Sequence, residues 1–253
     1  MKRLVEAKAQ EGKTDKETPE KKTGEKRTAH IPEKSRSVLD ELRTGQGPFK
    51  IDDFEDKDLW SIYFNDKWKQ NVVGRARLNV LVDPTHGANG TSSSMKIEYE
   101  LLDKNSNISV FIGGSWTTRL PEVERDRSNT YDLSRFNKMV FYLKGLRSET
   151  FFSKPNNILV YIHCFGEDIK SRSGKVACYY NKTTIRPDKG WKRIEISLDD
   201  FAPTPGTKRN AINYPEKPDL HNVLNFGLTF SSFESEGGIP GSNTVWVDEI
   251  TLE

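Results

Sequence analysis

The stretch NTVWVDEITLE, residues 243–253, decides the fold, because it has the composition of a strand that closes a β domain. It is rich in β-branched and aromatic residues, and no turn or helix signal interrupts it. Asp248 shares the alternation phase of Ile250 and Leu252, so simple alternation directs its carboxylate toward the core. A carboxylate there needs hydrogen bonds, an ionic partner or a metal. The acidic stretch IDDFED, residues 51–56, is the candidate partner, and we expect these two strands to lie side by side.

From Phe49 onward the chain consists of short β-like runs separated by turn clusters such as DPTHG, DKNSN and PDKG. Several runs alternate cleanly between apolar and polar residues, which is typical of strands buried on one face. The predicted strands are 49–55, 78–82, 94–102, 108–113, 138–146, 158–165, 175–185, 191–197, 225–231 and 244–252. This many short strands with no long helix predicts an all-β fold, an antiparallel β-sandwich.

The N-terminal region differs from the rest of the chain, because residues 1–48 contain no aromatic residue whereas the whole chain is 10% aromatic. Residues 1–34 have too few apolar side chains to offset their ordering entropy, so we expect a disordered, charged tail. Residues 35–43, SRSVLDELR, predict a short helix with Ser37 as its N-cap. Its apolar side is Val38, Leu39 and Leu42. The expected organisation is a linker over 1–48 and one domain over 49–253.

Charge and hydropathy exclude several classes of protein. The formal net charge is +2, divided as +3 over residues 1–45 and −1 over the remainder, so the aromatic-rich part lacks the basic excess of a nucleic-acid binder. No apolar run is long enough to span a membrane. The start, MKRLVEAKAQEGK, has no apolar segment and is not a signal peptide. Localisation stays open: extracellular or periplasmic if an export signal was removed, and cytoplasmic otherwise.

Cys164 and Cys178 are the two cysteines, which is too few for a disulfide framework. They flank a loop near Ser171, so a simple hairpin places them opposite each other on one face. Two reduced, buried thiols are the first interpretation, and a cross-strand disulfide is the alternative.

The order of several phrases adds a resemblance to a known family. They are IDDFED, SSSMKIEYEL, GGSW, YDLSRFNKMVFYLKG, ILVYIHCFG, GWKRIEISLDDF and VWVDEITLE. Together they resemble a jelly-roll carbohydrate-binding module of the family-eleven type attached to cellulases, in the galactose-binding-like superfamily. They equally resemble the related domain of the complex I intermediate-associated protein. The resemblance covers about residues 49–253 and implies a jelly roll with one concave sheet.

Members of these families often hold a structural calcium ion between the first and last strands. The resemblance places that Ca²⁺ at Asp53, Glu55 and Asp248, with Asp52 and Glu249 in reserve. Calcium prefers carboxylate and carbonyl oxygens, and backbone carbonyls would complete the shell. In the alternative interpretation, Asp53 and Glu55 are solvated and Asp248 accepts backbone N–H groups.

A concave sheet that binds sugar needs aromatic rings against the pyranose faces and polar groups for the hydroxyls. The residues that are out of phase with the core are therefore the candidates for ligand binding. They are Tyr142, Lys144, Tyr161, His163 and Tyr180 (or its neighbour Tyr179) on three runs, with Trp116 and Arg119 in a loop at the rim. Trp60, Trp68 and Arg172 are weaker candidates.

Three functions follow from these observations. The first is a non-catalytic module that binds a polysaccharide such as a β-glucan, with a tethered or separate glycoside hydrolase as partner. The second is an assembly scaffold that holds protein partners, as the complex I assembly domain does. The third is a jelly-roll polysaccharide lyase or hydrolase, because YIH at Tyr161–His163 resembles the QIH strand of alginate lyases. We find no recognised catalytic motif in the sequence and expect no catalytic residues.

Overall fold

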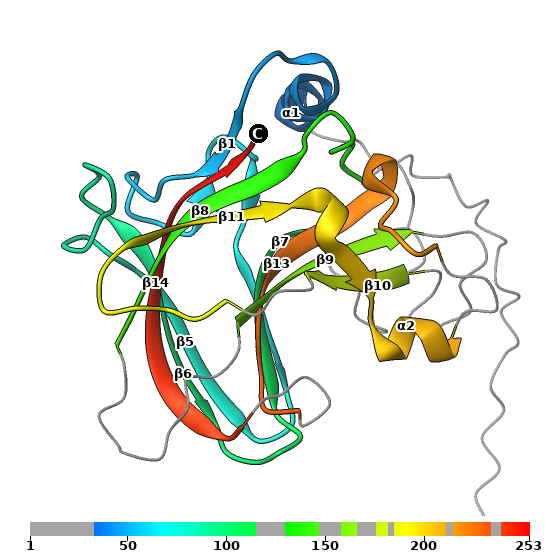
Figure 1. Ribbon diagram of the computed structural model, residues 1–253. Helices are drawn as coiled ribbons and strands as arrows, with labels where there is room; N and C mark the ends of the chain where they lie inside the picture. Colours follow the sequence, from blue (N-terminus) through cyan, green and yellow to red (C-terminus); the bar gives the residue numbers. More distant parts are fainter. Residues whose placement is uncertain are drawn as a thin grey trace, which may run out of the picture. The chain divides into compact units, whose positions relative to one another are not determined.

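The computed structural model describes residues 33–114, 130–146, 158–165, 176–181, 185–210, 215–233 and 239–253. Residues Pro32–Glu253 form one compact unit. Two large antiparallel sheets pack against each other in this unit (Figure 1), which confirms the predicted β-sandwich. None of the helices in the described ranges is long and apolar enough to cross a bilayer.

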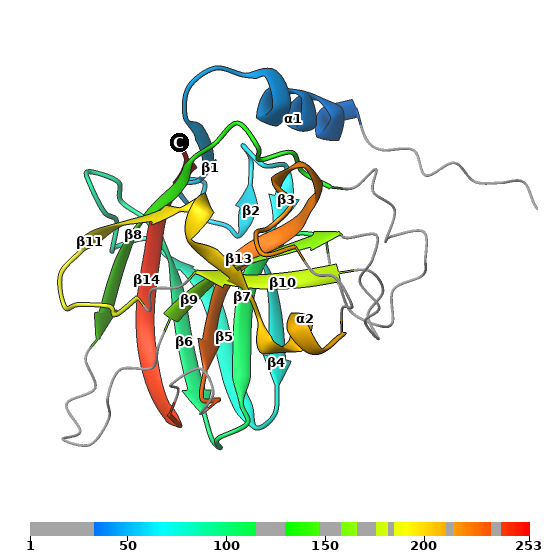
Figure 2. The ribbon, with the colours of Figure 1, turned by 45° about the vertical axis from the view of Figure 1, so that its right-hand side comes forward.

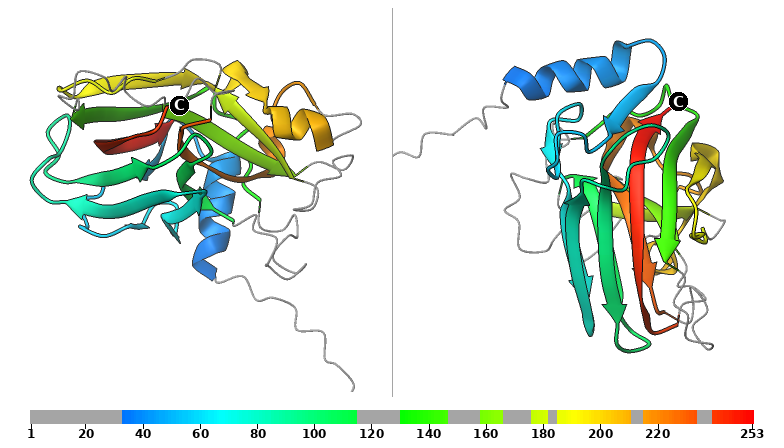
Figure 3. Two further views of the ribbon diagram at one scale, coloured as in Figure 1. Left: turned by 90° about the horizontal axis from the view of Figure 1, so that it is seen from below. Right: turned by 90° about the vertical axis from the view of Figure 1, so that its left-hand side faces the viewer.

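The first sheet, which we call the β14 sheet, has the strand order β11-β8-β14-β6-β5, and β1 adds to β14. Figure 3 shows β5, β6, β14 and β8 running next to one another. In chain order its strands are β1 (Phe49–Asp52), β5 (Ala76–Asp83), β6 (Ser94–Leu101), β8 (Lys138–Leu146), β11 (Lys192–Ser197) and β14 (Gly241–Leu252). Phe49 lies opposite Leu252, so the first and last strands are neighbours, as expected.

The second sheet, which we call the β13 sheet, has the order β12-β10-β9-β13-β7-β4. Its strands are β4 (Lys69–Val73), β7 (Asn107–Gly113), β9 (Ile158–Phe165), β10 (Val176–Asn181), β12 (Phe201–Pro203) and β13 (Val223–Ser231). The sequence did not predict β4 or β12, because one is mostly polar and the other has three residues. A small hairpin of β2 (Trp60–Ser61) and β3 (Asp66–Lys67) lies beside the sandwich (Figure 2).

The core lies between the two sheets and is built from alternate residues of each strand. Ile97, Leu143 and Val247 face it from the β14 sheet, and Val160 and Phe226 face it from the β13 sheet, all fully buried. This burial of apolar area is the main stabilising contribution to such a fold. The alternation that predicts the strands therefore also predicts which side of each strand lies in the core.

Asp248 does not face the core, contrary to the sequence expectation. The pairing of β14 with β8 shifts register between Asp248 and Thr251, and Glu249 has a φ of 46°. This β-bulge inserts an extra residue, so the faces exchange along β14. Trp246 and Asp248 point outward, whereas Ile250 points into the core.

Helix α1 (Glu33–Thr44) is longer than the predicted 35–43, so Ser37 is not its N-cap. Val38 and Leu42 are buried in the core cluster, so the compact unit includes a helix that the sequence assigned to the linker. The helix lies at the end of the sandwich where β1 and the C-terminus meet (Figure 2).

The side chain of Arg135 fixes the C-terminal end of α1. It donates to the carbonyls of Leu42 (2.7 Å), Gly47 (2.8 Å) and Glu41 (3.3 Å), and it stacks 3.9 Å from the centre of the Phe136 ring. The last carbonyls of a helix have no partner within the helix, so Arg135 takes the role of a C-cap. The other helices of the described residues are short: η3 (Leu198–Asp200), α2 (Pro205–Asn210) and η4 (Leu220–Asn222).

No disulfide joins the two cysteines; Cys164 is buried, as the first interpretation expects, whereas Cys178 is half-buried. The hairpin register is shifted by one residue from the simple expectation, because Cys164 lies opposite Ala177 and Cys178 lies opposite His163. The two sulfur atoms therefore lie on opposite faces of the β13 sheet. The disulfide alternative is wrong for this arrangement, since facing pairs are what a cross-strand disulfide requires.

Candidate functional site

The predicted ligand-binding residues do not share one face. Tyr142 and Lys144 lie on the outer side of the β14 sheet, whereas Tyr161, His163 and Tyr180 lie on the outer side of the β13 sheet. The assumption that the runs 138–146 and 158–165 are neighbouring strands is thus wrong. Trp116, Arg119 and Arg172 lie outside the described residues.

The outer face of the β13 sheet carries a group of polar residues, which we call the polar cluster: Asn107, Ser109, His163, Asn225 and Thr229. Asn107 Nδ2 donates to Thr229 Oγ1 at 2.8 Å, and Ser109 Oγ lies 3.3 Å from both Asn107 Oδ1 and Thr229 Oγ1. These side chains come from β7 and β13, which pair directly. The sequence signal for them was present, because they occupy the outward phase of strands whose other phase is apolar.

His163 and Asn225 form the second half of the polar cluster. His163 Nδ1 lies 2.7 Å from Asn225 Oδ1, and Asn225 Nδ2 donates to the carbonyl of Gly114 at 2.5 Å. A carbonyl only accepts, which fixes the orientation of the amide, so His163 holds its proton on Nδ1. Burial lowers the pKa of His163 to about 4, and the imidazole is therefore neutral at pH 7.

The centre of this face is closed to solvent. Tyr161 is 2% exposed and His163 is 8% exposed, with their ring centres 4.8 Å apart. Burial also raises the pKa of Tyr161 well above its usual range. Asn71 on β4 and Tyr180 on β10 flank the centre and are half-buried. The face is thus uncharged and sheltered in the middle, and more open at Asn71 and Tyr180.

The outer face of the β14 sheet has a different character, because its aromatic rings are covered by lysines. Lys144 Nζ lies 5.3 Å from the Trp246 ring centre and 5.9 Å from that of Trp191, and Lys96 Nζ lies 5.8 Å from Trp246. Trp246 is only 5% exposed, and its Nε1 donates to Asp83 at 2.9 Å. These cation–π contacts explain the place of Lys144 without a ligand.

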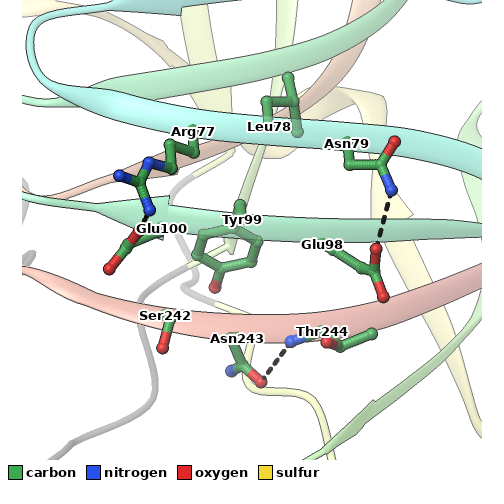
Figure 4. A pocket seen from close by; sticks show the side chains of 9 residues that line it. All are labelled: Arg77, Leu78, Asn79, Glu98, Tyr99, Glu100, Ser242, Asn243 and Thr244. Carbon is green, nitrogen blue, oxygen red and sulfur yellow. Dashed lines mark hydrogen bonds and ion pairs between the residues drawn. The ribbon is translucent and has the colours of Figure 1, made fainter.

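A pocket of about 500 Å³ lies on the same outer face, across β5, β6 and β14 (Figure 4). Arg77 pairs with Glu100 at 3.2 Å, and Asn79 Nδ2 donates to Glu98 at 2.8 Å. Tyr99 also borders the pocket, but its buried ring packs against Phe230, with ring centres 4.6 Å apart. The pocket therefore offers paired polar groups and no ring face for a sugar.

The three predicted calcium ligands are placed around two loops, and each has protein partners. Asp248 accepts from Ala88 N (2.7 Å), Thr91 Oγ1 (2.6 Å) and Glu249 N (2.7 Å), so it ties residues 84–93 to the last strand. Glu55 accepts from the backbone N–H groups of Ser92 and Ser93.

Asp53 is engaged by a cation of the protein itself. It accepts from Lys50 Nζ at 2.9 Å and from the hydroxyl of Tyr63 at 3.1 Å. Within the described ranges, no three acidic, histidine or cysteine side chains group as metal ligands. As arranged here, these residues do not fit a shared Ca²⁺, and the calcium ion stays a prediction.

Asp52, which the sequence held in reserve as a ligand, is buried beside Trp68. Its carboxylate accepts from Trp68 Nε1 (2.7 Å) and Phe54 N (3.0 Å). Burial raises the pKa of Asp52 from 3.8 to about 7 and that of Asp248 to about 6. Folding therefore extends the protonated form of Asp248 up to about pH 6 and that of Asp52 up to about pH 7.

The stability of the domain is expected to depend on pH through Asp52 and Asp248. Both pKa values are raised in the folded state, so the two carboxyl groups contribute fully to the free energy of unfolding below pH 3.8. This contribution is lost as the pH rises through about 6 for Asp248 and about 7 for Asp52. With chelator present, urea unfolding should show the free energy of unfolding falling over this window, and Asp52→Asn should flatten the fall. Ca²⁺ binds only ionised carboxylates, so if it binds here, the free energy of unfolding should rise with pH when Ca²⁺ is present. Identical curves with Ca²⁺ and with chelator would contradict the calcium prediction.

This fold is similar to the β-sandwiches of carbohydrate-binding modules. The chain resembles the family 11 carbohydrate-binding module of the cellulosomal cellulase Lic26A-Cel5E of Clostridium thermocellum, with a TM-score of 0.50, 18% identity, and coverage of 73% of this chain and 86% of that one. It also resembles the Clostridium thermocellum family 11 module in complex with a β-1,3-1,4-mixed-linked tetrasaccharide, with a TM-score of 0.51, 18% identity, and coverage of 81% and 95%. No protein-family model and no curated protein matches the sequence. The predicted family-11-like β-sandwich is confirmed. At this level of sequence identity, the structural similarity is evidence for the fold alone.

Proposed function

We propose that this protein is a non-catalytic carbohydrate-binding module that holds a β-glucan-like chain along the outer face of the β13 sheet. The observation that supports this best is the uncharged centre of this face, with the half-buried Asn71 and Tyr180 on either side of the buried polar cluster. An amide and an aromatic ring with a hydroxyl match the hydroxyls and the ring faces of a sugar without a net charge. The similar fold of a module that binds a mixed-linked tetrasaccharide supports the choice of ligand.

The opposite outer face is the weaker choice for a glycan. Its groups are paired ions, as in Arg77 with Glu100, and the Trp246 ring is covered by Lys96 and Lys144. Sugar binding relies on open ring faces. This face therefore supplies matched control positions.

Affinity electrophoresis on a panel of soluble glucans, mannans and xylans tests the proposal. We expect retardation by a mixed-linked β-glucan, and a roughly tenfold weaker association for Asn71→Ala combined with Tyr180→Ala, since one lost contact of about 1.4 kcal/mol gives that factor. Arg77→Ala combined with Asn79→Ala removes two polar side chains from the opposite face and should leave binding unchanged. Thermal melts of all variants control for folding.

Two outcomes contradict the proposal. In one, no glycan of the panel retards the parent protein. In the other, the variants on the two faces lose binding equally, which places the ligand elsewhere.

A protein-assembly domain is the second candidate, and the burial of Tyr161 and His163 favours it. Side chains that are buried on this face are not available to a polysaccharide, and a β-sandwich that binds no sugar can still bind proteins. The lyase alternative gains nothing from the structure, because proton transfer to a polymer requires an accessible group and His163 is 8% exposed. If no glycan binds while the protein migrates in native extracts as part of a large complex, assembly becomes the better explanation.

A further inference from the structure

Strand β11 is an open edge of the β14 sheet. It is the last strand in the sheet order, and among the described strands it pairs only with β8. Leu198 N donates to Asn137 O on the side of β8, and hydrogen-bonding direction alternates along an antiparallel strand. The backbone groups of Arg193, Glu195 and Ser197 therefore point away from the sheet.

The other edges of the sandwich are less available. β12 has three residues and ends at Pro203, which has no N–H to donate. On the far side β4 and β5 contact each other, and β1, which adds to the end of β14, has only four residues. The opening between the sheets thus lies along β11.

A pocket of about 320 Å³ lies in this opening, directly beside β11. Its floor is apolar: Ile185 and Ile196 are buried, and Ile194 is half-buried. Ile194 and Ile196 lie opposite Phe141 and Met139, so they point into the gap between the two sheets. Natural edge strands are often blocked by charges that point inward, but the middle of β11 presents two isoleucines there.

Charges mark the two ends of this pocket. Lys192 lies at the start of β11, and Asp200 lies beyond its end. The outward-facing pair Arg193 and Glu195 is neutralised by ion pairs. In the described ranges, by contrast, no ion pair involves Lys192, Asp200 or Arg186 on the opposite wall.

We propose that β11 is a docking edge for an extended segment of a partner protein, which adds as a further strand to the β14 sheet. Its alternate apolar side chains fill the pocket over Ile194 and Ile196, and its backbone pairs with Arg193, Glu195 and Ser197. An acidic residue faces Lys192 and a basic residue faces Asp200. Main-chain hydrogen bonds supply the affinity in this mode of recognition, and the alternate pockets supply the specificity. This surface is separate from both outer faces, so it does not depend on glycan binding.

The probe is the capped peptide Lys-Thr-Val-Thr-Val-Thr-Glu, which in antiparallel orientation places its central residue opposite Glu195, its two valines over the isoleucines, and its terminal Glu and Lys near Lys192 and Asp200. Titration followed by ¹H–¹⁵N NMR should shift the amide signals of Arg193, Glu195 and Ser197. The same peptide with proline at its central position lacks one backbone donor, and we expect it to bind at least tenfold more weakly.

Two protein variants form a matched pair. Glu195→Pro removes one outward N–H but none of the hydrogen bonds to β8, whereas Glu195→Thr loses the same ion pairs and keeps the N–H. Weaker peptide binding by about tenfold in Glu195→Pro alone supports the proposal. Lys192→Glu should prefer the peptide that carries Lys in place of its terminal Glu, a change that mere misfolding does not produce.

Several results would overturn the proposal. They are the absence of amide shifts on β11 at millimolar peptide, equal binding by Glu195→Pro and Glu195→Thr, and a parent protein that dimerises through β11. Dimerisation that is seen by sedimentation and abolished in Glu195→Pro would mean that β11 binds a second copy of this chain instead of a partner protein.

Discussion

Replacing Asp248 by alanine is expected to lower the free energy of unfolding by about 3 kcal/mol. Hydrogen bonds to a charged group contribute about 1.5–3 kcal/mol each, and their loss leaves buried donors without an acceptor. Asp248 is fully buried and holds Ala88 and Thr91 on the last strand. Without it, the N–H of Ala88, a residue that is itself 1% exposed, loses its acceptor. Urea unfolding measures the loss, which for a domain of this size corresponds to a fall in Tm of roughly 6–12 °C.

Residues 84–93 should also open locally in the same variant. Hydrogen exchange at the Ala88 amide reports this, and we expect it to accelerate far more than exchange in β6 or β8. Glu249→Gln is the matched control: its side chain accepts from Asn89 at 2.9 Å in an exposed position, so the change should be within about 0.5 kcal/mol. An Asp248→Ala protein as stable as this control would refute the assigned role of Asp248.

Phe64→Ala is expected to destabilise the domain by about 4 kcal/mol, within the usual range for deleting a buried phenylalanine. Phe64 is 2% exposed, and its ring centre lies 4.4 Å from Tyr131, 5.6 Å from Phe226 and 6.3 Å from Phe49. These partners belong to β1, to β13 and to the segment before β8. One side chain therefore joins the β2–β3 hairpin to both sheets.

Phe64→Leu keeps most of the volume and should cost less than half as much. Chemical denaturation of the two variants gives the comparison. If alanine and leucine destabilise equally, the aromatic contacts rather than the filled volume hold the hairpin, and the cavity argument fails.

The sequence predicted the strands well because alternation is a local signal. In runs such as 138–146 and 225–231, the alternation of apolar and polar residues identifies the buried side, whichever strands lie next to them. Alternation also marked Tyr142 and Tyr161 as outward, and both are. It carries no information on which sheet a strand joins, and this is why the two tyrosines were assigned to one face although they lie on opposite ones.

The errors at Asp248 and at the cysteines have a common physical origin. A single inserted residue reverses the faces of everything beyond it. The bulge at Glu249 uses a non-glycine residue at positive φ, which no local pattern announces. The hairpin that joins β9 to β10 is shifted by one position, and this shift separates the faces of Cys164 and Cys178.

The pairing of β1 with β14 has a consequence for how this domain combines with others. Phe49 and Leu252 face each other across one strand pair, so the two ends of the sandwich are separated by about 5 Å. Domains with adjacent ends tolerate circular permutation and transfer into a surface loop of a host protein. The part from Phe49 onward thus fits a single cut in a host chain, whereas a graft that keeps α1 on the core begins at Glu33.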